Sequence, residues 1–329
     1  MRRVRDLVAL PKAHLHLHLE GSARLSTITD LAARNGTALD VEDLMTFSTL
    51  AELIACYQLA QSTVAVPEDI ERLAYELLVD EAAQGVRWCE PTVTPFGFAD
   101  QFGSADVAWE AMRRGFDRAA AETGIGWGAI VGHIRTHPVE KAATIARWAA
   151  ERAGSGVVGF GLAGDEQLVG PEPFTEAFAI AAEAGLLLVP HAGETGGPES
   201  VRGALALGAH RLAHGVRSAE DPSLVRRLAD EGITCDVCPT SNLKLSVVPS
   251  MADHPLPTLL EGGVPVSLGT DDQLFFGSLL VDEYEVVRDG FGLSDSELAA
   301  IARTSVTASG APADLKTDLL AEIDAWLEP

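Results

Sequence analysis

The sequence has no hydrophobic run that approaches the roughly 20 residues needed to cross a bilayer. Its first residues, MRRVRDLVALPKAH, include basic side chains, but the apolar run among them is only about five residues long. A secretory signal peptide needs an apolar run of about 7–15 residues. We therefore expect a cytoplasmic protein with no membrane partner.

Basic residues and cysteines are also scarce. Lysine and arginine total 24 against 48 aspartates and glutamates, a formal net charge of −24. So negative a surface repels phosphate backbones, and we expect no nucleic-acid partner. Four cysteines do not make a disulfide framework, which suits a reducing compartment. Cys235 and Cys238 form a single C-x-x-C pair, which favours two small residues closing a buried strand over a structural zinc site.

What the chain does have is ample material for a core. Hydrophobic residues make up 47% of the 329 residues and charged residues 22%, as in globular proteins. The length suits one barrel of about 250 residues with insertions, so we interpret residues 1–329 as a single domain. Short apolar segments, several rich in β-branched residues, predict eight strands at residues 13–19, 86–93, 125–131, 157–162, 186–191, 211–214, 233–238 and 266–270.

Helical patterns lie between these strands. Residues 67–85 have proline at the start, acids in the first turn and glycine at the end, and residues 138–153, 172–184 and 221–231 are similar. Eight alternating units predict a (β/α)8 TIM barrel. An open doubly wound sheet is the alternative, but no G-x-G-x-x-G follows the first strand. About 65 residues separate the first two strands and predict extra helices over the barrel mouth, and the chain from Ser294 predicts C-terminal helices.

Unusual polar residues fall at the predicted carboxyl ends of strands, where barrel enzymes place their active sites. They are His16 and His18 of the first strand, which with His14 share one face by two-residue spacing, then His191, His214, Asp271 and Asp272. A lone H-x-H is weak evidence for a metal, because strand histidines are more often only hydrogen-bonded. Imidazoles and a carboxylate that converge in a barrel mouth suit zinc with one position open for water. The predicted ligands are His16, His18, His191 and Asp271.

The metal count also follows from a missing residue. Barrel hydrolases with two metals generally need a bridging ligand, often a modified lysine near the end of the fourth strand. Here that segment reads GVVGFGLAGDE and has no lysine, which also argues against a phosphotriesterase-type hydrolase. We therefore expect one zinc ion per chain, although the same ligands tolerate iron or manganese.

Six segments together resemble the adenosine deaminase family of the amidohydrolase superfamily. They follow the family's order and span nearly the whole chain: PKAHLHLHLEGS at 11–22, GFGLAGDE at 159–166, PHAGE at 190–194, RLAHGVR at 211–217, CPTSN at 238–242 and SLGTDDQ at 267–273. The resemblance implies zinc on the four ligands above and hydrolysis of adenosine or 2′-deoxyadenosine to inosine or 2′-deoxyinosine and ammonia.

The resemblance implies catalytic roles for Glu194, His214 and Asp271. Glu194 would protonate the purine nitrogen N1, and His214 would orient and help deprotonate the attacking water beside the ligand Asp271. The chemistry supports this, because attack at C6 breaks the aromaticity of the ring unless N1 gains a proton. General acids of this kind contribute roughly 10²–10⁴-fold. Glu194 could instead cap the following helix, since acids favour helix N-termini, but HAGE favours catalysis.

Substrate contacts are implied as well. Asp272 would hydrogen-bond N7, the backbone of Gly164 would contact N3, Glu20 would lie near the ribose, and His18 would also face the substrate. His14 stands where many family members have glutamate, and we interpret it as a core residue at the bottom of the barrel. We interpret the remaining histidines as structural or surface residues: His133, His137, His210 and His254.

The substrate is the least determined feature. Glu20 replaces the aspartate more usual in adenosine deaminases, and CPTSN resembles the adenine deaminase branch. Gln273 stands where proline is common. A third branch deaminates 6-aminodeoxyfutalosine, whose benzoate needs a cation, and Arg24 is a candidate unless it is only a solvated surface residue.

A metal-free binding pseudoenzyme would lose ligands, and none is missing. The sequence does not determine the oligomeric state, and a homo-oligomer is one of the alternatives.

Overall fold

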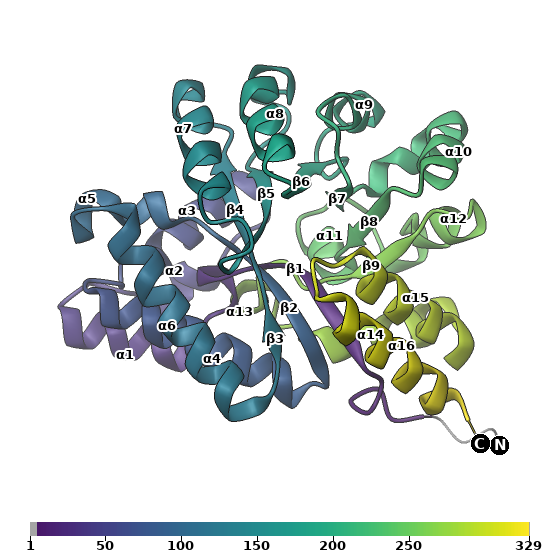
Figure 1. The fold of residues 1–329 in the computed structure, drawn as a ribbon, viewed down its shortest axis with the longest axis horizontal. Coiled ribbons are helices and arrows are strands. Elements are labelled where there is room, and N and C mark those ends of the chain that lie inside the picture. The colour runs from purple at the N-terminus through teal and green to yellow at the C-terminus, as the bar shows by residue number, and fades with distance from the viewer. Residues whose placement is uncertain (1–4, 329) are drawn as a thin grey trace.

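Eight parallel strands form the centre of the structure and helices surround them (Figure 1). The computed structural model describes residues 5–328. The strands are β1 (Lys12–His18), β2 (Val86–Val93), β3 (Gly126–Trp127), β4 (Ala129–Ile134), β5 (Val157–Ala163), β6 (Leu187–Ala192), β7 (Arg211–His214), β8 (Thr234–Val237) and β9 (Val266–Leu268). The short β3 pairs only with β2 and lies off the main sheet path.

The strands follow one another around a barrel in the order β1-β2-β4-β5-β6-β7-β8-β9, and all the pairings are parallel. Backbone hydrogen bonds bring the last strand to the first. The amides of Thr270 and Asp271 donate to the carbonyl of His16 at 3.2 and 3.1 Å, and the amide of His18 donates to the carbonyl of Asp271 at 3.0 Å. The predicted TIM barrel is confirmed.

Helices connect the strands on the outside. They are α1 (Leu25–Asn35), α2 (Val41–Met45), α3 (Leu50–Gln61), α4 (Pro67–Ala83), α5 (Ala99–Phe102), α6 (Ala105–Thr123), α7 (Val139–Ala150), α8 (Thr175–Glu183), α9 (Pro198–Ala206), α10 (Pro222–Glu231), α11 (Pro239–Lys244), α12 (Leu256–Glu261), α13 (Gln273–Phe276), α14 (Leu280–Phe291), α15 (Asp295–Ala308) and α16 (Ala313–Leu327). None of the helices in the described part of the chain is long and apolar enough to cross a membrane.

Helix ends follow the signals in the sequence. Helix α4 begins at Pro67, whose missing N–H costs nothing in the first turn. Helix α15 begins after Ser294, which forms a capping box with Glu297. The Glu297 amide lies 3.4 Å from Ser294 Oγ, and the Glu297 carboxylate accepts from the Ser294 amide at 2.7 Å. The C-terminal helices predicted from Ser294 are therefore present as α15 and α16.

The first three helices form the insertion predicted between the first two strands. Helix α3 contacts the short helix η1 (Glu20–Ser22), which directly follows β1 at the carboxyl end of the barrel. Phe47, before α3, packs edge-to-face against Phe275 and Phe276 of α13, with ring centroids 6.1 and 5.8 Å apart. These contacts place the insertion over the barrel mouth.

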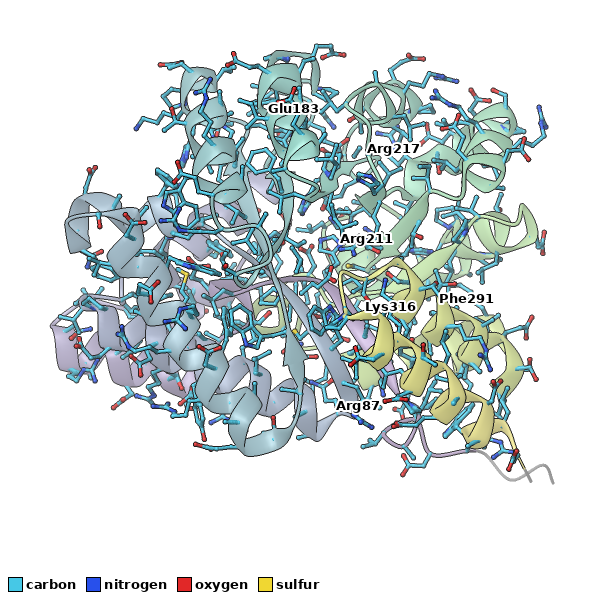
Figure 2. All side chains as sticks on the ribbon, in the orientation of Figure 1. Arg87, Glu183, Arg211, Arg217, Phe291 and Lys316 are labelled. Carbon is cyan, nitrogen blue, oxygen red and sulfur yellow. The ribbon has the colours of Figure 1, made fainter. Side chains whose placement is uncertain are left out.

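The opposite end of the barrel holds a buried charge cluster around Arg211, the first residue of β7 and labelled near the middle of Figure 2. Its guanidinium donates to Glu90 at 2.7 Å and to Asp236 at 3.0 Å, and all three side chains are buried. Two carboxylates around one guanidinium compensate the cost of burying these charges. This cluster closes the floor and leaves the carboxyl ends of the strands for the site.

Candidate active site

Four buried side chains from separate strands converge at the carboxyl end of the barrel. One potential ligand atom from each of His16, His191, His214 and Asp271 lies within 4.8 Å of the others. His16 comes from β1, His191 from β6, His214 from the end of β7, and Asp271 follows β9. Because the strands are parallel, their carboxyl ends meet at one rim, and residues up to 255 positions apart become neighbours.

The predicted ligand His18 faces the same point. Its Nε2 lies 3.2 Å from Nε2 of His191 and 3.2 Å from Oδ1 of Asp271. The four predicted ligands are thus brought together, and His214 joins them. Nε2 of His16 is buried without a hydrogen-bond partner, an arrangement that needs an explanation such as a bound ion. Imidazole nitrogens and a carboxylate around one point could hold a metal ion.

Neighbouring groups fix the orientation of these ligands. The carbonyl of Asp236 lies 3.0 Å from Nδ1 of His16, which leaves Nε2 directed at the centre of the site. Ser241 donates to Oδ2 of Asp271 at 2.8 Å. Such supports set the tautomer and direction of metal-binding side chains. The sequence assigned no role to Asp236, and Ser241 was noted only as part of the CPTSN segment, because only the fold brings these residues to the ligands.

Two of the converging residues have unusual backbone conformations. Asp271 has φ +62° and His214 has φ +73°, although neither is glycine. Residues other than glycine adopt these angles at a cost, and they persist where surrounding structure over-determines them. His214 is the last residue of β7 and Asp271 lies three residues past the end of β9, and at both the positive φ turns the chain.

Glu194, the predicted proton donor, lies beside His214. Its Oε2 is 3.6 Å from Nε2 of His214, and its side chain is only 4% exposed. Burial raises the pKa of Glu194 well above its usual value, and the carboxylates of Asp271 and Glu166 raise it further. Burial lowers the pKa of His214 to about 3, with His16 as a second cause. The site therefore combines a carboxyl group whose protonated form is favoured by burial with an imidazole that is neutral at neutral pH.

Asp272 sits at the side of this cluster. Its pKa is raised well above its usual value by burial, and then by the charges of Asp271 and Glu194. The chain of η1 passes very close to it: a Cβ placed on Gly21 would lie 1.6 Å from Oδ1 of Asp272. Glycine is therefore required in the EGS segment to make room for this carboxyl group.

Glu20 lies next to Asp272 in a polar group to which α3 contributes. The hydroxyl of Tyr57 donates to Oε2 of Glu20 at 2.7 Å, and Nε2 of Gln61 donates to Oε1 at 3.2 Å. Burial raises the pKa of Glu20, and these hydrogen bonds partly offset that increase. Tyr57 and Gln61 could not be identified from the sequence, because the inserted helices carry no motif that shows which face meets the barrel.

Arg24 and Gln273, whose roles the sequence left open, have partners of their own. Arg24 forms a two-pronged ion pair with Asp80 at 2.8 and 2.6 Å on α4. Its side chain is 40% exposed, and it also lies 3.8 Å from Glu76. Nε2 of Gln273 donates to Oε1 of Glu81 at 2.5 Å. Neither side chain lies free beside the metal-binding centre.

The expectation that His14 shares a face with His16 and His18 is wrong. Nδ1 of His14 lies 2.7 Å from Oε2 of Glu81 on α4, and its Nε2 accepts from the Thr270 amide at 3.1 Å. The pairing of β1 with β2 slips between residues 14 and 17, and such an irregularity breaks the two-residue alternation of side chains. His14 is fully buried, as expected for a core residue.

The histidines interpreted as structural or surface residues lie outside the converging group. His133 and His254 are buried, whereas His137 and His210 are exposed. Cys235 and Cys238 are buried free thiols. Gly164 directly follows β5 with φ +96°, so its backbone turns at the rim of the barrel.

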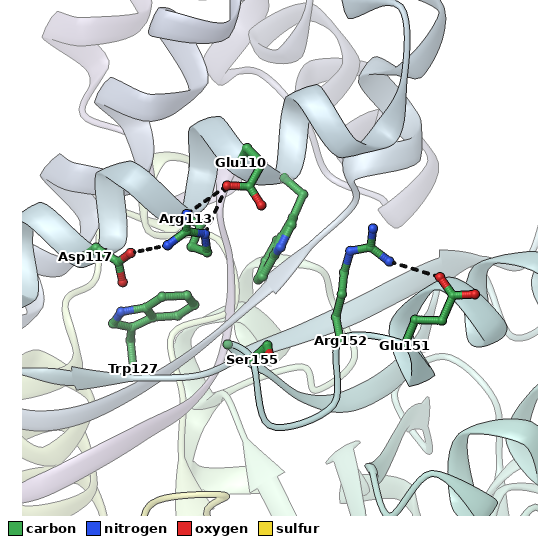
Figure 3. Close-up of a pocket in the computed structure, with 9 residues that line it drawn as sticks. Glu110, Arg113, Asp117, Trp127, Glu151, Arg152 and Ser155 are labelled. Atoms are coloured by element: carbon green, nitrogen blue, oxygen red, sulfur yellow. Dashed lines mark hydrogen bonds and ion pairs between the residues drawn. The ribbon is translucent and has the colours of Figure 1, made fainter.

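A cavity of about 570 Å³ lies elsewhere, between α6 and the chain before β5 (Figure 3). Trp109, Trp127 and Gly156 line it, at the amino ends of the strands. Its two arginines are paired: Arg113 with Glu110 and Asp117, and Arg152 with Glu151 and Asp106. This cavity lies at the opposite end of the strands from the converging group.

Comparisons with known proteins agree with this geometry. The profile of a family described as adenosine deaminase matches residues 11–326. A Streptomyces virginiae protein, provisionally named an adenosine/adenine deaminase, is 45% identical over 99% of both chains. An aminodeoxyfutalosine deaminase of Streptomyces coelicolor is 38% identical over 98% of this chain and 86% of its own.

Solved structures show the same architecture. The adenine deaminase of Arthrobacter aurescens superposes with a TM-score of 0.89 at 31% identity, covering 97% of this chain and 99% of its own. An amidohydrolase from Burkholderia ambifaria, solved with bound zinc, superposes with a TM-score of 0.89 at 27% identity over 97% and 92% of the chains.

Proposed function

The chain belongs to the adenosine deaminase family of hydrolytic deaminases, and we propose that it removes the 6-amino group of adenosine or 2′-deoxyadenosine with one bound zinc ion. Water and the nucleoside would give inosine or 2′-deoxyinosine and ammonia. The observation that carries this proposal is the placement of Glu194 beside His214 at the rim where His16, His191 and Asp271 converge.

The donor set favours zinc. His16, His18, His191 and Asp271 supply three imidazoles and one carboxylate, the ligand types that zinc prefers at catalytic sites. The partnerless Nε2 of His16 and the 3.2 Å approach between Nε2 of His18 and Nε2 of His191 both suit a cation between them. Zinc held there would supply Lewis acidity, which lowers the pKa of a coordinated water to about 7.

The protein's own groups would handle the protons. Neutral His214 accepts the proton of the attacking water, and its proton then goes to the leaving amine, which departs as ammonia. Glu194, whose pKa burial raises, would donate its proton to N1 as the new bond forms at C6, so that negative charge does not build up on the ring. Its carboxylate would then take the proton of the new C6 hydroxyl as the product carbonyl forms and the amine departs, which restores the acid. Asp272, whose pKa is also raised, would hydrogen-bond N7 on the other side of the amino group.

Glu20 supports a nucleoside in preference to a free base. Its buried carboxylate, together with the hydroxyl of Tyr57 and the amide of Gln61, makes a polar group beside Asp272. The two ribose hydroxyls can both donate to a carboxylate, whereas free adenine has a single ring N–H donor at that edge. We propose that this group binds the ribose of the substrate and that the backbone of Gly164 contacts N3 of the purine.

Two other substrates have specific support. The Arthrobacter aurescens relative is named an adenine deaminase, and the longer side chain of Glu20 leaves less room for ribose than aspartate would. The Streptomyces coelicolor relative is named an aminodeoxyfutalosine deaminase. The ion pair between Arg24 and Asp80 counts against 6-aminodeoxyfutalosine as the substrate. Arg24 is the cation expected to bind the benzoate of that substrate, and its guanidinium is already paired with the Asp80 carboxylate.

The test is an ammonia-release assay on protein of measured zinc content. It compares kcat/KM for adenosine, 2′-deoxyadenosine, adenine and 6-aminodeoxyfutalosine. A preference for the first two supports the proposal. A tenfold or greater preference for adenine or for 6-aminodeoxyfutalosine keeps the chemistry and replaces the substrate, while ammonia from none of the four overturns the proposed function.

A further inference from the structure

One buried carboxylate, Glu166, binds the segment that carries the proposed proton donor. Its Oε2 accepts from the amide of Gly193 at 2.7 Å, and its Oε1 accepts from the amides of Glu194 and Thr195 at 2.8 and 3.1 Å. The hydroxyl of Ser200 also donates to Oε2. Three consecutive backbone amides on one carboxylate are a strong set, because hydrogen bonds to a charged acceptor are about twice as strong as neutral ones.

The same segment is also held by Arg135, a fully buried residue that follows β4. Its guanidinium donates to the carbonyl of His191 and, at 3.1 Å, to the carbonyl of Val169. Arg135 thus binds the backbone of a proposed metal ligand, while Glu166 binds the backbone three residues later. The HAGE segment is thus held by both a cation and an anion, which come from the ends of the neighbouring strands β4 and β5.

The segment needs such support because its own sequence does not order it. Residues 191–197 read HAGETGG and have no regular structure after β6 ends at Ala192. Gly193 has φ +73°, and a Cβ there would lie 2.6 Å from Cγ2 of Val201. Glycine-rich connections are the most mobile parts of a fold unless they are tied down. Helix α9 begins only at Pro198, after the proton donor.

We propose that Glu166 is a positioning residue for catalysis: it fixes the backbone of Glu194 so that the carboxyl group meets the substrate ring nitrogen. This inference rests on the proposed deaminase function and extends it to a residue that does not touch the substrate. A shift of about 1 Å in a reacting group can cost roughly 10²-fold in rate, so the effect of losing the contact should fall on kcat.

Glu166→Gln is the direct test. Each carboxylate oxygen accepts two hydrogen bonds. An amide NH₂ in place of Oε1 would face two N–H donors and lose both contacts, and in place of Oε2 it would lose the Gly193 contact, although the Ser200 hydroxyl could turn to accept from it. We expect kcat for adenosine to fall by roughly 10²-fold, with KM changed by less than about threefold. Bound zinc should be retained, because Glu166 contacts none of the four proposed ligands and the carbonyl of His191 stays bound to Arg135. Glu199→Gln, an exposed change at the start of α9, is the matched control and should leave kcat unchanged.

A double-mutant cycle separates positioning from a general structural effect. If Glu166 acts through Glu194, then Glu166→Gln should cost less than about threefold in a Glu194→Gln background, where the proton donor is already lost. If Glu166→Gln does not fold, Glu166→Asp replaces it in the cycle. Aspartate keeps the negative charge, but its side chain is one methylene too short to reach the amides of residues 193–195. Folding of each variant is checked by circular dichroism and by the melting temperature.

The outcomes distinguish this role from the function itself. Equal losses in both backgrounds, or a Glu166→Gln enzyme as active as the wild type, would overturn the positioning role and leave the deaminase function intact. A zinc-loaded wild type that releases no ammonia from any of the four aminopurines would overturn the function, and the role of Glu166 with it.

Discussion

Replacing Glu194 with glutamine tests the central step of the proposed reaction. The carboxyl group is 4% exposed and lies 3.6 Å from Nε2 of His214. Burial and nearby carboxylates raise its pKa, which favours the neutral form of the native side chain. Glutamine is neutral and nearly the same size, so the substitution removes an acidic proton without removing a charge or opening a cavity.

The expected loss can be stated as a rate. A positioned general acid contributes roughly 10²–10⁴-fold, which corresponds to about 3–5 kcal/mol of transition-state stabilisation. The loss should fall on kcat and kcat/KM together, because a proton delivered to N1 matters only as the new bond forms at C6. Zinc content and melting temperature should stay close to those of the wild type, since His16, His18 and Asp271 are untouched.

The assay is steady-state release of ammonia from adenosine, with the zinc content of each sample measured. In the wild type, activity should persist to neutral pH and fall as the pH rises through the raised pKa of Glu194, because the protonated form is the donor. A Glu194→Gln enzyme within about threefold of the wild type, with full zinc content, would refute the reasoning.

Three further changes extend these expectations. Asp271→Asn keeps a residue that tolerates φ +62° but removes the negative charge, so metal analysis after dialysis should show zinc lost; retained zinc would remove Asp271 from the ligands. Glu20→Ala should raise KM for adenosine more than for adenine, and equal effects would take Glu20 out of the ribose site. Burial lowers the pKa of His254 from 6.5 to about 4, so the unfolded chain binds this proton first as the pH falls. Up to about 3 kcal/mol of stability should then disappear between about pH 6.5 and 4, and urea unfolding of His254→Asn should depend less on pH in that range; unchanged dependence would refute this.

Local signals in the sequence predicted most elements of the fold. Pro67 and Ser294 stand at real helix starts, and the segment 211–214 is a strand with the predicted bounds. Boundaries moved where backbone geometry intervened. The predicted strand 125–131 is divided into β3 and β4 at Gly128, whose amide donates to the carbonyl of Cys89.

The irregular pairing of β1 was not visible in the sequence. The spacing of His14, His16 and His18 is uniform, and only the slip against β2 shows that His14 faces Glu81. A bulge depends on how two strands meet, so the residues of one strand do not reveal it. The pairing of Arg24 with Asp80 is similar, because the two residues are 56 positions apart and become neighbours only when α1 packs near α4.

The sequence by itself determined the chemistry of this protein, because metal ligands, an acid and a base need particular side chains, and the order of strands and helices gives the rim where they meet. The tertiary structure alone decided what holds them in place. Arg135 reads as an ordinary charged residue in the chain, and Glu166 ends the GFGLAGDE segment, which by itself assigns it no role. They become the supports of the HAGE segment only because neighbouring strands end side by side, which brings their charges against the backbone of residues up to 56 positions away.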